Sequence, residues 1–132
     1  MLDSSGSIRA SNRDGVDNWK LMLTFVKNLV KKMKLATGQS RVGLVIYSDE
    51  ARSEFLLSDS NDKHYLETLI DGLESKYEGG STNTAAALRE MHYNQFQELN
   101  GDRPGVKNVA LLITDGVSTI DKENTVPEAL VG

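Results

Sequence analysis

The sequence predicts an α/β fold: an open, doubly wound, mostly parallel sheet with one antiparallel edge strand and helices on both faces. Amphipathic helical segments alternate with short apolar runs of strand length, the pattern typical of such sheets. The run at 41–47 is almost continuously apolar, as in strands that are covered on both faces. A length of 132 residues suits one domain, so we expect a single unit over residues 1–132.

The first half of the chain predicts a strand end, a helix and a hairpin. Met1 and Leu2 fit only the tail of a strand. Residues 41–47 and 51–57 predict two strands, and the short link between them favours an antiparallel pair, since parallel neighbours need a long crossover. A helix is predicted over 17–34, because apolar residues recur there at spacings of three and four: Trp19, Met22, Leu23, Val26, Leu29, Val30 and Met33.

The second half continues the alternation of helix and strand. Helices are predicted over 63–73 and 83–99, the second of them capped by Thr82. Residues 101–105 form a loop rich in glycine, and 108–114 predict a third apolar strand. A last helix is predicted to begin near Thr125, where Thr125 and Glu128 have capping-box spacing.

Composition excludes several classes of function. The net charge of −4 argues against nucleic acid as a partner, and the lysines between 27 and 34 fit the solvated face of a helix. No apolar run is long enough to insert into a membrane. The absence of cysteine excludes disulfides, thiolate zinc sites and cysteine nucleophiles. The chain also lacks a P-loop, a dinucleotide fingerprint and a G-x-S-x-G elbow.

The most informative motif is Asp3-Ser4-Ser5-Gly6-Ser7, which has the pattern D-x-S-x-S. In a tight turn, Ser5 and Ser7 can point the same way while Gly6 relieves crowding of the backbone. One carboxylate and two hydroxyls are hard oxygen ligands suited to a hard divalent cation. By itself, however, such a cluster is also an ordinary turn or helix cap.

Two distant segments carry matching chemistry. Thr82 lies in a glycine-rich loop before a predicted helix, and Asp115 follows the apolar run at 108–114. Ligands of open α/β sheets bind beyond the carboxyl ends of the strands, so these residues and the first motif can converge there. Singly, Thr82 fits an N-cap and Asp115 a turn after a strand. Together they predict a metal site, with the ligands Asp3, Ser5, Ser7, Thr82 and Asp115.

The ligand types indicate which metal binds. Oxygen donors without cysteine or histidine favour Mg²⁺, Mn²⁺ or Ca²⁺ over Zn²⁺. Only Asp3 and Asp115 are charged, so the cation would stay electron-poor and keep bound waters, as Mg²⁺ usually does. An acidic side chain of a partner can replace one of these waters. The site thus gives an acidic protein a way to bind acidic ligands.

These motifs resemble the metal-ion-dependent adhesion site (MIDAS) of von Willebrand factor type A (VWA) domains. The segments 41–48, 86–88 and 100–105 further resemble the extracellular-matrix branch, such as matrilins and the A domains of collagens. The resemblance implies that Ser5, Ser7 and Thr82 are direct or switchable ligands and that Asp3 and Asp115 act largely through water. It also implies a partial VWA domain over 1–132, with the last strands and closing helices of the family lying beyond Gly132.

The resemblance implies a secreted, non-enzymatic module for adhesion or matrix assembly. Its partner would be a matrix protein or receptor that offers an acidic residue to the metal. One alternative is an intracellular VWA subunit of a larger complex. Another is a Mg²⁺-dependent phosphotransferase or phosphatase with Asp3 as nucleophile. Such enzymes usually need a second carboxylate two residues further on, and here that position is Ser5.

Overall fold

A three-stranded mixed sheet forms the centre of the computed structural model, which describes residues 1–35 and 39–115. The strands are β1 (Leu2–Asp3), β2 (Leu44–Tyr47) and β3 (Ala51–Phe55), in the order β1-β2-β3. β1 pairs with β2 in parallel, and β2 pairs with β3 antiparallel. The antiparallel edge strand that the short link predicted is therefore confirmed.

The predicted third strand at 108–114 is not a regular strand. Only Ile113 bridges Leu2 in parallel, with a hydrogen bond from the Asp3 amide to the Ile113 carbonyl at 3.0 Å. Its neighbour β1 spans only Leu2–Asp3, so little of the segment has a strand to pair with. Val109 and Leu111 are 78% and 49% exposed, so much of the apolar segment faces solvent. The segment still runs beside β1 and brings residues 114 and 115 to the same sheet edge as Asp3.

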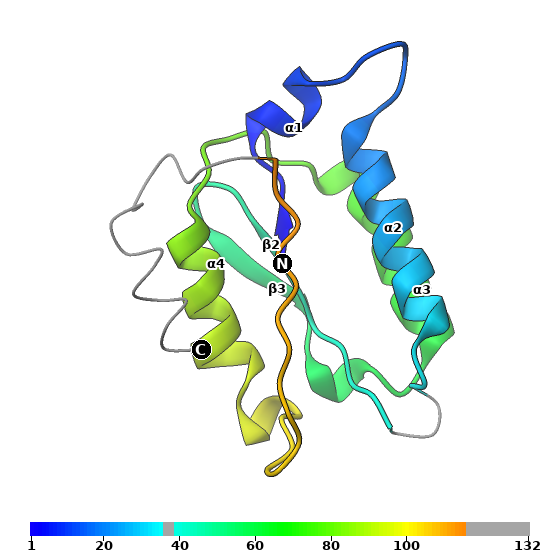
Figure 1. Ribbon diagram of the computed structural model, residues 1–132, viewed down its shortest axis with the longest axis vertical. Coiled ribbons are helices and arrows are strands. Elements are labelled where there is room, and N and C mark those ends of the chain that lie inside the picture. The colour runs from blue at the N-terminus through cyan, green and yellow to red at the C-terminus, as the bar shows by residue number, and fades with distance from the viewer. Residues whose placement is uncertain (36–38, 116–132) are drawn as a thin grey trace.

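The helices α2 (Asn18–Lys32) and α3 (Lys63–Gly72) pack together on one face of the sheet, as Figure 1 shows. Both begin at an aspartate whose side chain accepts a backbone N–H, which satisfies a free donor of the first turn. The indole nitrogen of the fully buried Trp19 donates to the Leu73 carbonyl at 3.0 Å. The predicted apolar stripe of α2 is confirmed in part: Trp19, Leu23, Val26 and Val30 are buried, Met22 and Met33 are partly buried, and Leu29 is 38% exposed.

The helix predicted over 83–99 is broken. α4 (Thr84–Glu90) covers the other face of the sheet and is followed by a π-helical turn over Met91–Gln95 and a 3-10 turn over Glu98–Asn100. Gln95 turns inward, and its amide donates to the Phe55 carbonyl at 2.8 Å. Satisfying a buried polar group in this way competes with continuing a regular helix.

Asn83, not the predicted Thr82, caps α4. The Asn83 side chain accepts a hydrogen bond from the Ala86 amide at 3.0 Å. An amide oxygen reaches the first-turn N–H groups as well as a hydroxyl does, so sequence alone does not separate the two residues. The side chain of Thr82 is therefore not used as the cap.

Short turns complete the described fold: α1 (Gly6–Ala10), η1 (Leu57–Asp59) and η2 (Leu73–Lys76). The core lies between the sheet and α2 and α3, and residues from all three elements meet in it. Within the described ranges, no helix combines the length and apolar character needed to cross a bilayer. The helix predicted near Thr125 lies outside the described residues.

We expect Gly101→Ala to destabilise the fold more than Gly105→Ala. Both glycines have a positive φ, which costs a residue with a Cβ about 1 kcal/mol or more. A Cβ at Gly101 would also lie 2.4 Å from the Ser58 amide nitrogen, whereas one at Gly105 meets nothing within 4 Å. The free energy of unfolding should fall by about 3 kcal/mol at Gly101 and by about 1 kcal/mol at Gly105. Urea unfolding followed by circular dichroism tests this, and equal losses would contradict it.

Candidate metal centre

The D-x-S-x-S turn links β1 to α1 and orders its own polar groups. Asp3 is fully buried at the end of β1, and its Oδ1 accepts a hydrogen bond from the Ser5 amide at 2.9 Å. The hydroxyls of Ser5 and Ser7 share a hydrogen bond of 3.1 Å. Ser4 points elsewhere, since its hydroxyl donates to the Tyr47 carbonyl at 3.0 Å. The two serines of the motif thus present their oxygens on the same side of the turn.

The segment after 108–113 closes on this turn from across the sequence. The Ser7 hydroxyl donates to Asp115 Oδ1 at 2.9 Å. The Thr114 hydroxyl donates to Asp3 Oδ2 at 2.6 Å. Both contacts follow from the parallel pairing of Ile113 with Leu2, which aligns the ends of the two segments. Asp3, Ser5, Ser7 and Asp115 therefore form one connected group.

The loop that carries Thr82 is fastened to the same turn through the backbone. The Gly6 amide donates to the Gly80 carbonyl at 2.8 Å, and the Gly79 amide donates to the Ser4 carbonyl at 2.8 Å. A Cβ at Gly6 would lie 2.9 Å from the Gly79 oxygen, so only glycine permits this close approach. Thr82 lies in this loop and is 5% exposed. The structure thus holds the Thr82 loop against the D-x-S-x-S turn.

Asp49, which belongs to none of the predicted site motifs, also orders this loop. Asp49 Oδ1 accepts a hydrogen bond from the Ser81 amide at 2.8 Å, and its backbone carbonyl accepts one from the Asn83 side chain at 3.2 Å. The neighbouring Ser48 hydroxyl donates to the Ser81 carbonyl at 2.7 Å. The signal was available, because Ser48 and Asp49 directly follow β2 at the same sheet edge as Asp3.

Tyr77 supports the turn from its other side. Its hydroxyl donates to the Ser5 carbonyl at 2.5 Å and accepts the Arg9 amide at 3.2 Å. The Arg9 guanidinium lies 4.4 Å from the Tyr77 ring centre and pairs with Asp17. A lone tyrosine in a predicted loop belongs to no motif, so this contact could not be predicted from the sequence.

Tyr47 lies beside the candidate site, and its surroundings shift the pKa of its hydroxyl. Burial raises the pKa of the Tyr47 hydroxyl above its ordinary value, and the nearby carboxylates of Asp3 and Asp115 raise it further. The nearby hydroxyls of Thr114 and Thr84 lower the pKa in part. The hydroxyl thus stays neutral at physiological pH. Any negative charge of this centre comes from its carboxylates.

The oxygen spacings fit a small octahedral cation. Oxygens about 2.1 Å from an ion in an octahedron lie about 3.0 Å apart along each edge. The distances from Ser7 Oγ to Ser5 Oγ and to Asp115 Oδ1 are 3.1 and 2.9 Å. Among the described residues, no group of three or more His, Cys, Asp or Glu side chains is arranged to hold a metal ion.

The candidate ligands differ in their exposure to solvent. Asp3 and Ser5 are 0% and 1% exposed, whereas Ser7 and Asp115 are exposed at the surface. A cation held here would rest on a buried carboxylate and face solvent on its other side. This arrangement is suited to a ligand that arrives from another molecule.

Comparison with known proteins agrees with this geometry. The family model of the von Willebrand factor type A domain matches residues 1–130 of this chain. The chain is 36% identical over 121 residues to Cuticlin-6 of Caenorhabditis elegans, covering 92% of this chain and 19% of that protein. It is 31% identical over 118 residues to Matrilin-1 of Gallus gallus, covering 89% of this chain and 22% of that protein. The chain thus spans about a fifth of the length of these relatives.

Solved structures share the fold. Proximal thread matrix protein 1 from the mussel byssus, in crystal form 2, aligns with a TM-score of 0.82 and 26% identity, covering 98% of this chain and 33% of that one. A second structure of the mussel protein has a zinc-occupied MIDAS motif; it aligns with a TM-score of 0.80 and 24% identity, covering 99% and 34%. The predicted fold class is thereby confirmed.

The named relatives include a matrilin and a cuticlin, and an extracellular location follows from them, which confirms the expectation from the sequence. The family match covers nearly the whole chain, and the structural alignments cover the same extent. The chain therefore belongs to the von Willebrand factor type A family, in its extracellular-matrix branch.

Proposed function

We propose that this chain is a non-enzymatic module that binds matrix proteins through a divalent cation. The cation is Mg²⁺, with Mn²⁺ or Ca²⁺ as substitutes, and its site consists of Asp3, Ser5, Ser7, Thr82 and Asp115. The observation that carries the proposal is the line of oxygens from Ser5 through Ser7 to Asp115, spaced at 3.1 and 2.9 Å. These oxygens come from opposite ends of the described chain and meet at one edge of the sheet.

Each residue has a distinct task. Ser5 and Ser7 offer neutral oxygens to the ion, and Asp115 adds a charge at the solvent side. Asp3 holds the turn through the Ser5 amide and receives the Thr114 hydroxyl. When bound, the cation supplies an electron-poor centre that accepts a carboxylate oxygen from a partner. Because hydroxyls neutralise no charge, the site keeps its attraction for that carboxylate.

The choice of metal rests on the donors. Hydroxyl and carboxylate oxygens favour Mg²⁺, and cysteine is absent from the sequence. The zinc in the mussel protein supports metal binding by a MIDAS motif on this fold. Preference for Mg²⁺ in this chain is a separate prediction, which titration with both ions tests.

An enzymatic use of Asp3 is disfavoured by its surroundings. A nucleophilic carboxylate must reach its substrate, but Asp3 is fully buried, and both of its oxygens accept hydrogen bonds. The matrix and cuticle proteins among the relatives support a binding role. They also argue against an intracellular subunit.

We expect Mg²⁺ or Mn²⁺ to raise the melting temperature of the chain and Asp115→Ala to abolish the rise. A ligand at a hundred times its dissociation constant adds about 2.7 kcal/mol of stability. The control is Glu98→Ala, which removes the same charge from an exposed residue of the 3-10 turn at Glu98–Asn100 and should keep the full response. Calorimetry in EDTA and in each metal provides the measurement. A melt that is indifferent to metal would overturn the proposed site.

We expect Gly6→Ala to weaken metal binding although it changes no ligand. The added Cβ would lie 2.9 Å from the Gly79 oxygen and push the Thr82 loop away from the turn. Disturbing groups that support a metal site typically costs tenfold or more in affinity, so we expect about a tenfold loss. Gly72→Ala is the control, since its Cβ meets nothing within 4 Å. Titration calorimetry with Mn²⁺ compares the two, and equal affinities would contradict the role of the loop.

The function itself predicts binding that depends on the cation. Purified matrix proteins should bind the immobilised chain in Mg²⁺ and dissociate in EDTA, and Asp115→Ala should bind none of them. Esterification of the carboxylates of a bound partner should remove the interaction, because the metal would lose its incoming ligand. Binding that persists in EDTA would argue for a different interface.

A further inference from the structure

The basic side chains of the described residues divide according to what they contact. Ion pairs with carboxylates are formed by Arg9, Lys20, Lys27, Arg52 and Lys76. A second set, Lys63 and Arg41, donates to backbone carbonyls instead. A carbonyl holds a cation in place without neutralising its charge. The second set therefore remains able to attract an external anion.

The contacts of this second set join separate elements. Lys63 Nζ, at the start of α3, donates to the Lys31 carbonyl near the end of α2 at 2.6 Å. Arg41, just before β2, donates through Nη1 to the Gly101 carbonyl at 2.7 Å. Both cations are thus positioned by the fold. Holding a long side chain in advance reduces the entropy lost when it binds a ligand.

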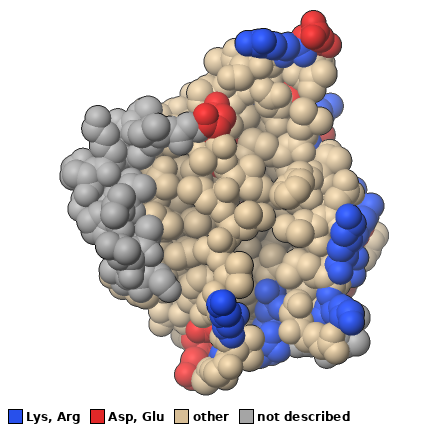
Figure 2. All heavy atoms as spheres, in the orientation of Figure 1, with Lys and Arg blue, Asp and Glu red and all other residues tan. Residues whose placement is uncertain are grey.

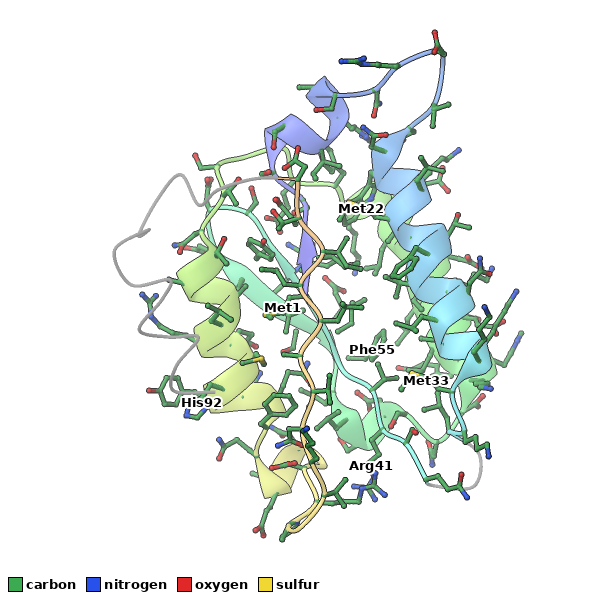
Figure 3. The ribbon with its side chains drawn as sticks, viewed as in Figure 1. Met1, Met22, Met33, Arg41, Phe55 and His92 are labelled. Atoms are coloured by element: carbon green, nitrogen blue, oxygen red, sulfur yellow. The ribbon has the colours of Figure 1, made fainter. Side chains whose placement is uncertain are left out.

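Further cations extend the surface. Arg103 Nη2 donates to the Gln39 carbonyl at 3.2 Å, which places it beside the loop that leaves α2. In Figure 3, Arg41 and Met33 lie at the end of the molecule that is remote from α1, and Figure 2 shows Lys and Arg along the right and lower margins. We call this surface the basic end, and it comprises Lys31, Lys32, Lys34, Arg41, Lys63, Arg103 and Lys107.

The basic end runs against the overall charge of the chain. The segments 31–41, 56–63 and 97–108 contain seven cationic residues and four acidic ones, although the net charge of the chain is −4. Two of these acidic side chains cap backbone N–H groups: Asp59 accepts from Leu56 at 2.8 Å, and Asp62 accepts from Tyr65 at 3.1 Å. Positive charge is therefore concentrated at the basic end, whereas acidic residues outnumber basic ones in the rest of the chain.

We propose that the basic end binds a sulfated polysaccharide. Clustered Lys and Arg attract polyanions, and several separate cations suit a chain with repeated sulfate groups. Nucleic acid is also a polyanion, but the extracellular branch of the family favours the polysaccharide. Binding here requires neither the cation nor the D-x-S-x-S turn. The proposal thus goes beyond the metal-dependent function and is independent of it.

The test is the affinity of the chain for a heparin oligosaccharide, measured in EDTA near physiological salt. The variant Lys31→Gln/Lys32→Gln/Lys63→Gln should bind about tenfold more weakly or worse, because each lost cation removes a charged contact. The matched control, Lys20→Gln/Lys27→Gln/Lys76→Gln, removes the same charge from lysines that are already ion-paired. It should bind as the unchanged chain does. Equal losses in the two variants, or no binding by the unchanged chain, would overturn the proposal.

Further measurements identify the ligand and test whether lost affinity reflects misfolding of the variant. Lys32→Gln/Lys107→Gln alters two exposed side chains that form no hydrogen bond or ion pair within the described part of the chain, so it should lower affinity without changing the melting temperature. Hyaluronan, duplex DNA and phosphatidylserine vesicles should bind more weakly than the sulfated chain at equal charge. Equal or tighter binding of any of these would overturn the assignment. Asp115→Ala should bind heparin normally, which separates failure here from failure of the metal site.

Discussion

The buried carboxylate of Asp3 is the constraint on which the site depends. A buried charge is costly unless hydrogen bonds or an opposite charge compensate it. Asp3 accepts one bond from the Ser5 amide and another from Thr114, and no described ion pair includes it. These two bonds tie the first turn of the chain to the segment that ends at Asp115. The need to satisfy one carboxylate thus fixes the geometry of the others.

Short-range patterns predicted the elements whose contacts are local. The helix at 17–34 and the hairpin after 41–47 were correct because spacing and link length determine them. The strand at 108–114 was wrong as a regular strand, since its pairing depends on how much of β1 lies beside it. The break after Glu90 also escaped prediction, because it involves the contact of Gln95 with the distant Phe55 carbonyl.

The candidate site shows the same division. Ligand-bearing residues could be selected because oxygen-rich side chains recur at the ends of predicted strands and helices. Their supports could not, since Tyr77 reaches Ser5 across 72 residues and belongs to no motif. Asp49 is an intermediate case, because it lies just after a strand but does not begin a D-x-S-x-S motif. Sequence thus identifies the chemistry of a site more readily than the groups that hold it in position.

The sheet leaves different surfaces for different kinds of contact. The β3 edge is occupied by charge: Arg52 pairs with Glu54 and Glu78, and Lys76 pairs with Glu54. Charged side chains on an edge strand oppose pairing with another sheet. α4 and the α2–α3 pair cover the two faces (Figure 1). This edge and these faces thus leave the two ends of the sheet for recognition: the proposed metal site lies at the carboxyl ends of the strands, and the basic end lies at the end remote from α1.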